Sequence, residues 1–186
     1  CTMNQTLQPF LRKFVLVFFD DILIYSKSWA DHLEHIQLVL STLMKHQFFA
    51  NHKKCTFGKQ QIEYLGHIIQ QGSVSMDPKK VECMLRWAVP KDIKALRGFL
   101  GLTGYYRRFI RGYGNIAKPL NDLLKKGCFS WSSKADTAFG ELKSAMTTAP
   151  VLTLPDFSKP FEVECDASGR GLGAVLSQNQ HPIAFF

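Results

Sequence analysis

The 186-residue chain has no long run of apolar residues and no closely spaced pair of cysteines. Its longest apolar run, residues 14–19, has the length of a strand, whereas a membrane helix needs about 20 residues. The five cysteines are scattered without C-x-x-C spacing, so neither a zinc knuckle nor a disulfide framework is supported. Internal repeats and low-complexity segments are also lacking. We therefore expect a globular protein of a reducing, intracellular environment, with no membrane partner.

The net charge of +8 is unevenly distributed along the chain. Residues 91–127 hold nine Lys and Arg against two Asp, a balance of +7, whereas residues 128–186 hold four basic against six acidic residues, a balance of −2. A basic block in a globular chain is typical of a protein that binds a polyanion such as nucleic acid. A solvated helical face rich in Lys would give the same balance, so charge alone leaves both interpretations open.

The stretch FVLVFFDDILIYS places two adjacent carboxylates between two apolar runs. Phe14–Phe19 and Ile22–Tyr25 are typical of short buried strands, and Asp20 and Asp21 would form the tip of a tight hairpin, because Asp tolerates turn geometry. Adjacent like charges repel, and a divalent cation such as Mg²⁺ would relieve that repulsion with hard oxygen ligands. The alternative is an ordinary solvated acidic turn.

The rest of the chain predicts alternating helical and strand segments. Ser28 can cap a helix to about Gln47, with apolar residues at helical spacing: Leu33, Ile36, Leu40 and Leu43. Residues 55–77 predict short strands interrupted at Gly58, Gly66 and Gly72. Asp77 and Pro78 begin a helix that ends before Pro90. Two or three short helices follow over 92–126.

A capping-box pattern at Ser133 and Asp136 predicts a further helix, which ends before Pro150. Its apolar stripe would consist of Ala135, Ala138, Phe139, Leu142 and Met146. After Pro150 the pattern changes to strands, in PFEVECDAS, GLGAVLSQ and PIAFF. Basic helices thus give way to acidic strands between residues 128 and 150.

Four stretches, in this order, resemble one family, the reverse transcriptases of gypsy-type LTR retrotransposons. VFFDDILIYS is similar to the catalytic hairpin of the palm, YLGHII to the hairpin that grips the primer, and LRGFLGLTGYYRRFI to the thumb. FEVECDASGRGLGAVLSQ resembles the first strands of the ribonuclease-H-like domain that follows the polymerase in these polyproteins. Many relatives have Tyr where this chain has Phe18, and the missing hydroxyl bears on nucleotide or primer contacts.

The resemblance implies phosphoryl transfer with Mg²⁺ or Mn²⁺, in which Asp20 matches a direct metal ligand and Asp21 the second Asp of the motif. Asp166 matches the first of four acidic residues of the ribonuclease H site. The chain begins with Cys1 and ends within a predicted strand, so we expect an internal fragment. A further metal-binding Asp would then lie upstream, and three further ribonuclease H residues downstream.

The same resemblance implies an α+β fold with four parts. These are a palm fragment at 1–76, a helical thumb at 77–127, a connecting helix at 128–150 and the first part of a ribonuclease-H-like sheet at 151–186. Expected partners are an RNA or DNA primer–template, deoxynucleoside triphosphates and the rest of the polyprotein. The alternative function is that of a non-catalytic, nucleic-acid-binding remnant.

Candidate nucleic-acid contacts come from three of the matching stretches. Arg pairs well with phosphate, whereas Tyr105 and Tyr106 can either pack internally or lie against a sugar or base. His67 is either a strand residue satisfied by the backbone or a contact to the primer. The apolar residues of the thumb stretch, such as Leu96 and Phe99, are predicted to form core. The full candidate set is Phe18, Gly66, His67, Arg97, Tyr105, Tyr106, Arg107, Arg108 and Arg111.

Overall fold

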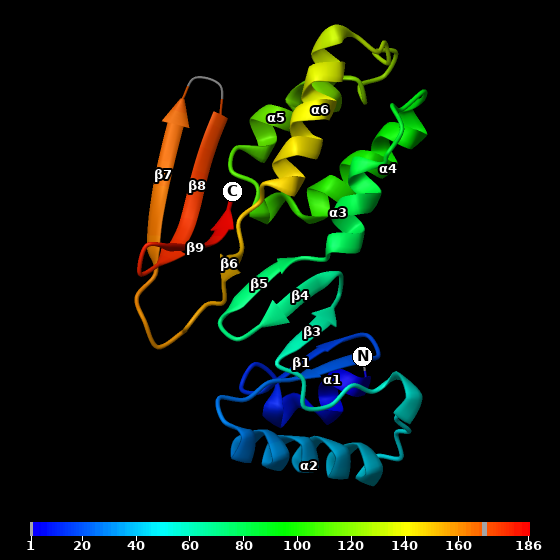
Figure 1. The fold of residues 1–186 in the computed structure, drawn as a ribbon. Coiled ribbons are helices and arrows are strands. Elements are labelled where there is room, and N and C mark those ends of the chain that lie inside the picture. The colour runs from blue at the N-terminus through cyan, green and yellow to red at the C-terminus, as the bar shows by residue number, and fades with distance from the viewer. Residues whose placement is uncertain (1, 169–170) are drawn as a thin grey trace. The chain divides into compact units, whose positions relative to one another are not determined.

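A computed structural model of the chain describes residues 2–168 and 171–186 (Figure 1). Of the five cysteines, Cys1 lies outside these residues. The chain divides into two compact units, residues 1–60 and 61–186. Within the described residues, no helix is long and apolar enough to cross a membrane.

The first unit packs one long helix against a two-stranded hairpin (Figure 1). Its elements are α1 (Thr2–Thr6), η1 (Gln8–Phe10), β1 (Val15–Phe18), β2 (Asp21–Ile24), α2 (Trp29–Lys45) and η2 (His52–Lys54). Its core consists of Leu7, Val15, Val39 and Leu43. The predicted strands are therefore present, but the prediction that both are buried was wrong. Leu16 is 40% and Phe18 51% exposed, because a two-stranded ribbon on one helix covers only one of its faces.

Helix α2 begins where the sequence predicts, and the Ser28 side chain accepts a hydrogen bond from the Asp31 amide (3.1 Å). The predicted inner face was partly wrong. Leu33 is 52% and Leu40 39% exposed, whereas Val39 and Leu43 are buried. The inward stripe passes through positions 32, 35, 36, 39 and 43, which also follow helical spacing. The helix contains two apolar stripes, and only packing against the hairpin selects one of them.

The second unit combines helices with two antiparallel sheets (Figure 1). Its strands are β3 (Gln61–Tyr64), β4 (His67–Gln70), β5 (Ser73–Met76), β6 (Leu152–Thr153), β7 (Glu162–Ser168), β8 (Gly171–Gln178) and β9 (His181–Phe185). Its helices are α3 (Pro78–Leu85), α4 (Ile93–Tyr105), η3 (Arg107–Phe109), α5 (Tyr113–Asp122) and α6 (Ser133–Thr147). One sheet has the order β3-β4-β5-β6 and the other β7-β8-β9. The mixed α+β fold is confirmed.

Two apolar clusters hold this unit together. One joins α4, α5 and α6, with Leu96, Phe99 and Leu142 among its fully buried side chains. The other joins α3 and η3 to the end of α6 and to β5 and β6, and Phe185 of β9 packs against it. All five predicted apolar positions of α6 are buried.

The N-cap residues of two helices can be compared directly with those predicted from the sequence. Asp77 caps α3 as predicted, since its carboxylate accepts from the Lys79 amide at 2.9 Å. The predicted cap of α6, Ser133, was wrong by one residue. Ser132 is the cap, and its hydroxyl accepts from the Ala135 amide at 3.4 Å. Adjacent serines offer the same capping chemistry, so the local pattern alone cannot choose between them.

Candidate functional site: an acidic hairpin and a basic aromatic groove

The hairpin of the first unit turns within two residues, Phe19 and Asp20, because Phe18 pairs with Asp21 across the ribbon. Phe19 has φ of 51°, in the left-handed region that favours glycine. The expectation that the two Asp form the tip was therefore only half right. Asp20 lies in the turn, Asp21 begins β2, and an aromatic residue takes the strained position. Strained backbone of this kind is concentrated at functional sites in proteins.

Both carboxylates of the hairpin are exposed, and so are the aromatic rings before them. Phe18 is 51% and Phe19 74% exposed, and their rings meet edge to face with centroids 4.8 Å apart. The apolar face of β1 and β2 packs on α2, which fixes the backbone that carries the acids. The result is a short, rigid ribbon with polar oxygens and apolar rings at its solvent-facing end.

Hard carboxylate oxygens are the donors that Mg²⁺ and Mn²⁺ prefer, so the chemistry of Asp20 and Asp21 fits such an ion. Two acids on one turn supply only part of a coordination shell. Over residues 2–168 and 171–186, no group of three or more His, Cys, Asp and Glu gathers to complete one. The hairpin is thus a partial donor set.

The second unit contains a tight turn at Leu65 and Gly66, where φ is 50° and 72°. Two successive positive φ values are typical of a two-residue hairpin turn, which joins β3 to β4 here. A Cβ on Gly66 would lie 2.7 Å from the hydroxyl oxygen of Tyr106. Both the dihedral angle and the lack of space therefore require glycine at this position.

The two adjacent tyrosines of the thumb stretch bind this turn through their hydroxyls. Tyr105 Oη donates to the carbonyl of Leu65 (2.8 Å), and Tyr106 Oη donates to that of Gly66 (2.7 Å). Burial, with smaller contributions from Tyr105 and nearby acids, raises the pKa of Tyr106 to about 12, so the hydroxyl stays a donor.

These tyrosines differ in exposure, which separates the two alternatives left open by the sequence. Tyr106 is 1% exposed, and its side chain lies in the core rather than at a surface where nucleic acid could reach it. The prediction that Tyr106 contacts nucleic acid was therefore wrong. Tyr105 is 53% exposed and keeps one side of its ring at the surface.

His67 is also buried, at 6% exposure, which favours the alternative of a strand residue satisfied by the backbone over a direct primer contact. Its Nδ1–H donates to the Leu65 carbonyl (2.9 Å), because a carbonyl can only accept. Nε2 is then the acceptor for Arg108 Nη2 at 3.0 Å. Burial, and secondly the charge of Arg108, lower the pKa of His67 and favour this neutral ring.

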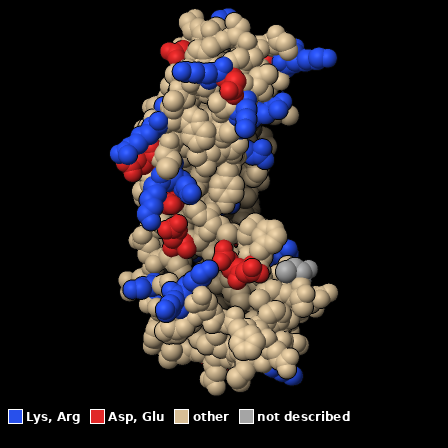
Figure 2. Space-filling view, turned by 90° about the vertical axis from the view of Figure 1, so that its right-hand side faces the viewer, with Lys and Arg blue, Asp and Glu red and all other residues tan. Residues whose placement is uncertain are grey.

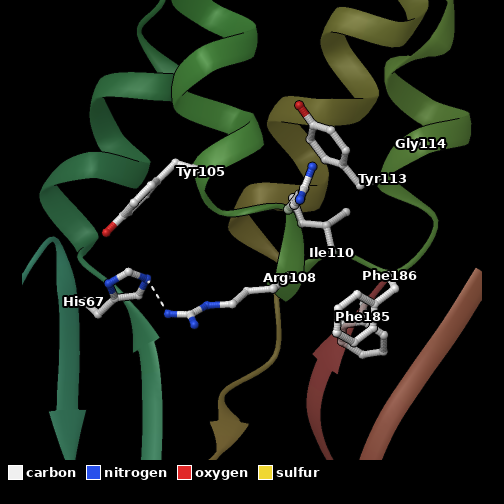
Figure 3. A pocket seen from close by; sticks show the side chains of 9 residues that line it. His67, Tyr105, Arg108, Ile110, Tyr113, Gly114, Phe185 and Phe186 are labelled. Carbon is white, nitrogen blue, oxygen red and sulfur yellow. Dashed lines mark hydrogen bonds between the residues drawn. The ribbon is translucent and has the colours of Figure 1, made fainter. Parts of the chain in front are cut away.

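The predicted arginines are all exposed, but they fall into different places. Arg107 and Arg108 line one groove of about 690 Å³, together with Tyr105 and His67 (Figure 3). Arg111 lines a second groove of about 830 Å³, and Arg97, on α4, lines neither. In the upper part of Figure 2, Lys and Arg stand among Asp and Glu rather than forming one unbroken patch. The predicted arginines therefore do not share one groove.

Asp166 lies on β7, where it pairs with Gly173 of β8. Together with Glu164 it lines the second groove, which also includes Arg111 and Lys118 beside α5. Residues 161–167 of this segment are all exposed.

Sequence reasoning missed three aromatic residues of the first groove, Tyr113, Phe185 and Phe186. Tyr113 begins α5, and its hydroxyl lies 3.0 Å from Thr103 Oγ1. A partly buried aromatic residue at a helix start gives only a weak local indication of a groove. Phe185 belongs to a strand 72 positions away along the chain, and no local pattern connects it to the thumb stretch.

Comparison with known proteins gives two family matches. Residues 1–69 match the family described as reverse transcriptase (RNA-dependent DNA polymerase), and residues 131–186 match the RNase H-like domain found in reverse transcriptase. The chain is 44% identical over 190 aligned residues to the Pol polyprotein of transposon 297 from Drosophila melanogaster, covering 98% of this chain and 18% of that protein. It is 35% identical to the gypsy Pol polyprotein of the same species, covering 97% and 19%. The chain thus spans about a fifth of these polyproteins.

An uncharacterized mitochondrial protein of Arabidopsis thaliana, AtMg00860, is 54% identical over 131 residues, covering 69% of this chain and 83% of that protein. Among solved structures, the foamy viral protease–reverse transcriptase in complex with double-stranded DNA matches with a TM-score of 0.89 and 23% identity. That match covers 100% of this chain and 33% of the viral one, and it shows the fold. The same viral protein in complex with an RNA/DNA hybrid matches with a TM-score of 0.87. The chain therefore belongs to the reverse transcriptase and RNase H-like region of retrotransposon Pol polyproteins.

Proposed function

We propose that this chain supplies the metal-binding hairpin and the primer–template-binding helices of an RNA-directed DNA polymerase. The observation that carries the proposal is the pair of exposed carboxylates at a rigid, strained turn, Asp20 and Asp21. Membership of a family of nucleotidyltransferases supports it, and so do the structural neighbours, which are complexes with DNA and with an RNA/DNA hybrid.

In this proposal Asp20 is the direct ligand of a divalent cation and Asp21 assists it from the first position of β2. A cation held there supplies charge neutralisation for phosphoryl transfer to a primer. The protein's part is to hold the carboxylate oxygens fixed, which the packing of the hairpin on α2 provides. Phe18 and Phe19 present apolar surface beside the acids, where a nucleotide base or sugar can lie.

The second unit provides the nucleic-acid contacts in this proposal. Exposed guanidiniums on α4, η3 and the segment before α5 bind backbone phosphates of the duplex: Arg97, Arg107, Arg108 and Arg111. Asp166 belongs to the linked ribonuclease H function, as one donor of its own cation site.

The polymerase assignment is tested by Asp20→Asn in the full-length polyprotein. We expect loss of primer extension with Mg²⁺ and with Mn²⁺ and an unchanged circular dichroism spectrum, because the exposed carboxylate contributes little to folding. Glu34→Gln is the matched control, since Glu34 is an exposed acid of the same unit on α2. Primer extension close to wild type by the Asp20→Asn variant would contradict the proposal.

The second candidate function is that of a non-catalytic nucleic-acid-binding chain. It is favoured by the partial donor set around Asp20 in the described residues. Both candidates require duplex binding, whose affinity should fall steeply with salt as counterions are released. Replacing Arg107 and Arg108 with Ala should reduce the salt slope by about one per lost phosphate contact. Arg86→Ala is the control, because Arg86 is an exposed arginine paired with Glu82 (2.6 Å).

A further inference from the structure

The groove between η3, the start of α5 and β9 combines positive charge with aromatic surface (Figure 3). Arg107 and Arg108 contribute guanidiniums, and Tyr105, Tyr113, Phe185 and Phe186 contribute rings. No Asp or Glu occurs among the described residues that line it. A groove with two cations, of which Arg108 is held by His67, and with apolar walls fits an anion that also carries a flat, apolar group.

Arg108 is held in place within this groove by a buried partner. His67, which is 6% exposed, is fixed by the Leu65 carbonyl on one nitrogen and accepts from Arg108 on the other. The His67 ring also lies near the rings of Tyr105 and Phe109, with centroid distances of 5.3 and 5.6 Å. A guanidinium carries five N–H donors, and the bond to His67 uses one of them. The exposed guanidinium is therefore oriented before any ligand arrives.

The aromatic side chains give the groove a surface for stacking. Tyr105 is 53% exposed, and Phe185 is half-buried against the core cluster of η3. In Figure 3 the two Phe rings lie at the opposite end of the groove from His67. Single-stranded nucleic acids are held by this combination, in which bases stack on aromatic rings and phosphates meet basic side chains. The volume of about 690 Å³ is that of a small-ligand pocket, too small for a duplex.

We propose that this groove binds an unpaired nucleotide at a single-stranded overhang. Its phosphate would be bound by Arg108, its base would stack on the aromatic wall, and His67 would act as a positioning residue for Arg108. The inference rests on the proposed nucleic-acid function and deepens it, because it assigns Arg108, one of the proposed phosphate contacts, to the phosphate of an unpaired nucleotide beside the duplex.

The test compares three DNA probes by fluorescence anisotropy with the 186-residue chain at fixed salt. One is a blunt duplex, the second carries a three-nucleotide overhang, and the third carries the same overhang without bases. We expect the overhang to raise affinity about tenfold over the blunt duplex, from one stacked base, and the abasic overhang to give at most a small part of that gain.

Variants then locate the gain in the groove. Phe185→Leu and Arg108→Gln should each reduce it to about twofold or less, whereas Phe157→Leu, at an 84% exposed ring outside the groove, should keep it. His67→Leu should lose the gain, and His67→Gln should restore it, because an amide can donate to Leu65 and accept from Arg108. A merely structural role of His67 would change blunt and overhang binding alike.

Each outcome decides the inference. Equal affinity for blunt and overhang duplexes overturns the inference, and so does an abasic overhang that binds as well as the complete one. In either case, salt-dependent binding of the duplex still supports the proposed function. A gain kept by both Phe185→Leu and Arg108→Gln also overturns the inference. Binding of no probe overturns the proposed function and the inference together. The probe comparison uses the unaltered chain, so it holds even where a variant fails to fold.

Discussion

Gly66→Ala is the substitution whose effect the structure defines most closely. Two costs should add. The first is the left-handed backbone, with φ of 72°, where a Cβ costs about 1–2 kcal/mol. The second is the approach of that Cβ to Tyr106 Oη, at 2.7 Å, which displaces a buried hydroxyl and breaks its bond to the Gly66 carbonyl. One such hydrogen bond contributes about 1 kcal/mol net. We expect a total loss of about 2–3 kcal/mol of unfolding free energy.

Gly72→Ala provides a matched control for the backbone cost. Gly72 has nearly the same φ, 71°, and a Cβ there would meet no atom within 4 Å. It should therefore cost about 1–2 kcal/mol, from the left-handed conformation alone. The difference between the two glycine variants measures the contact with Tyr106.

Tyr106→Phe isolates the hydroxyl and completes a double-mutant cycle. Alone it should cost about 0.5–1 kcal/mol, because the Gly66 carbonyl also accepts from the Asp77 amide (3.1 Å) and stays satisfied. In this background a Cβ on Gly66 would meet only the ring carbon Cζ, at 3.9 Å, an ordinary contact. The double variant should be more stable than the sum of the single effects predicts, by about 1 kcal/mol.

The assay is urea unfolding followed by Trp fluorescence in a Trp29→Phe background. The remaining reporters, Trp87 and Trp131, then both lie in the second unit. Equal costs for Gly66→Ala and Gly72→Ala, or strict additivity with Tyr106→Phe, would refute the reasoning, since either result means that the hydroxyl does not fill the space above Gly66.

Three further outcomes follow from the same structure. The pKa of His67 is lowered on folding, so the folded state binds fewer protons than the unfolded state around the ordinary pKa of 6.5. The contribution of His67 to stability is therefore complete above pH 6.5 and falls as the pH decreases below it. Urea unfolding at pH 7.5 and at pH 5 should show this fall, and His67→Gln should reduce it. Lys143→Met removes the ammonium that donates to the carbonyls of Leu85 (2.8 Å) and Trp87. It should lower the free energy of unfolding in urea by about 1–2 kcal/mol. Lys134→Met, on the same helix, should leave it almost unchanged. The 186-residue chain alone should not extend a primer with Mg²⁺ or Mn²⁺, because cooperating ligands fail as a unit; extension above an Asp20→Asn control would show a more complete site.

Local chemistry predicted most of the elements of this fold. Caps such as Ser28 and Asp77, and the glycines that end β3 and β4, act within a few residues, so they are readable from the sequence. The acidic hairpin was likewise predictable from two apolar runs around Asp20. Family resemblance then indicated what the acids do, which composition and spacing alone left open.

Features that depend on contacts between distant residues were not predictable. The choice of Val39 over Leu40 as the inner face of α2 depends on the hairpin it packs against. The burial of His67 and Tyr106 depends on a helix about 40 residues away, and the groove needs Phe185 from yet another strand. Phe19 in a left-handed turn contradicts local preference, so its conformation was not predictable from the residue type.

The two turn residues Leu65 and Gly66, and His67 at the start of β4, are each bound by a side chain from the end of α4 or from η3: Tyr105, Tyr106 and Arg108. These three bonds tie the segment at residues 65–67 to the end of α4 and to η3, so a change in the orientation of α4 also displaces this segment. Helix α4 has 13 residues and is about 20 Å long, so a rotation of about 5° about its far end displaces the turn by about 2 Å. In enzymes a shift of about 1 Å can cost a hundredfold in rate. The orientation of α4 thus determines the position of any nucleic-acid strand whose end contacts this turn.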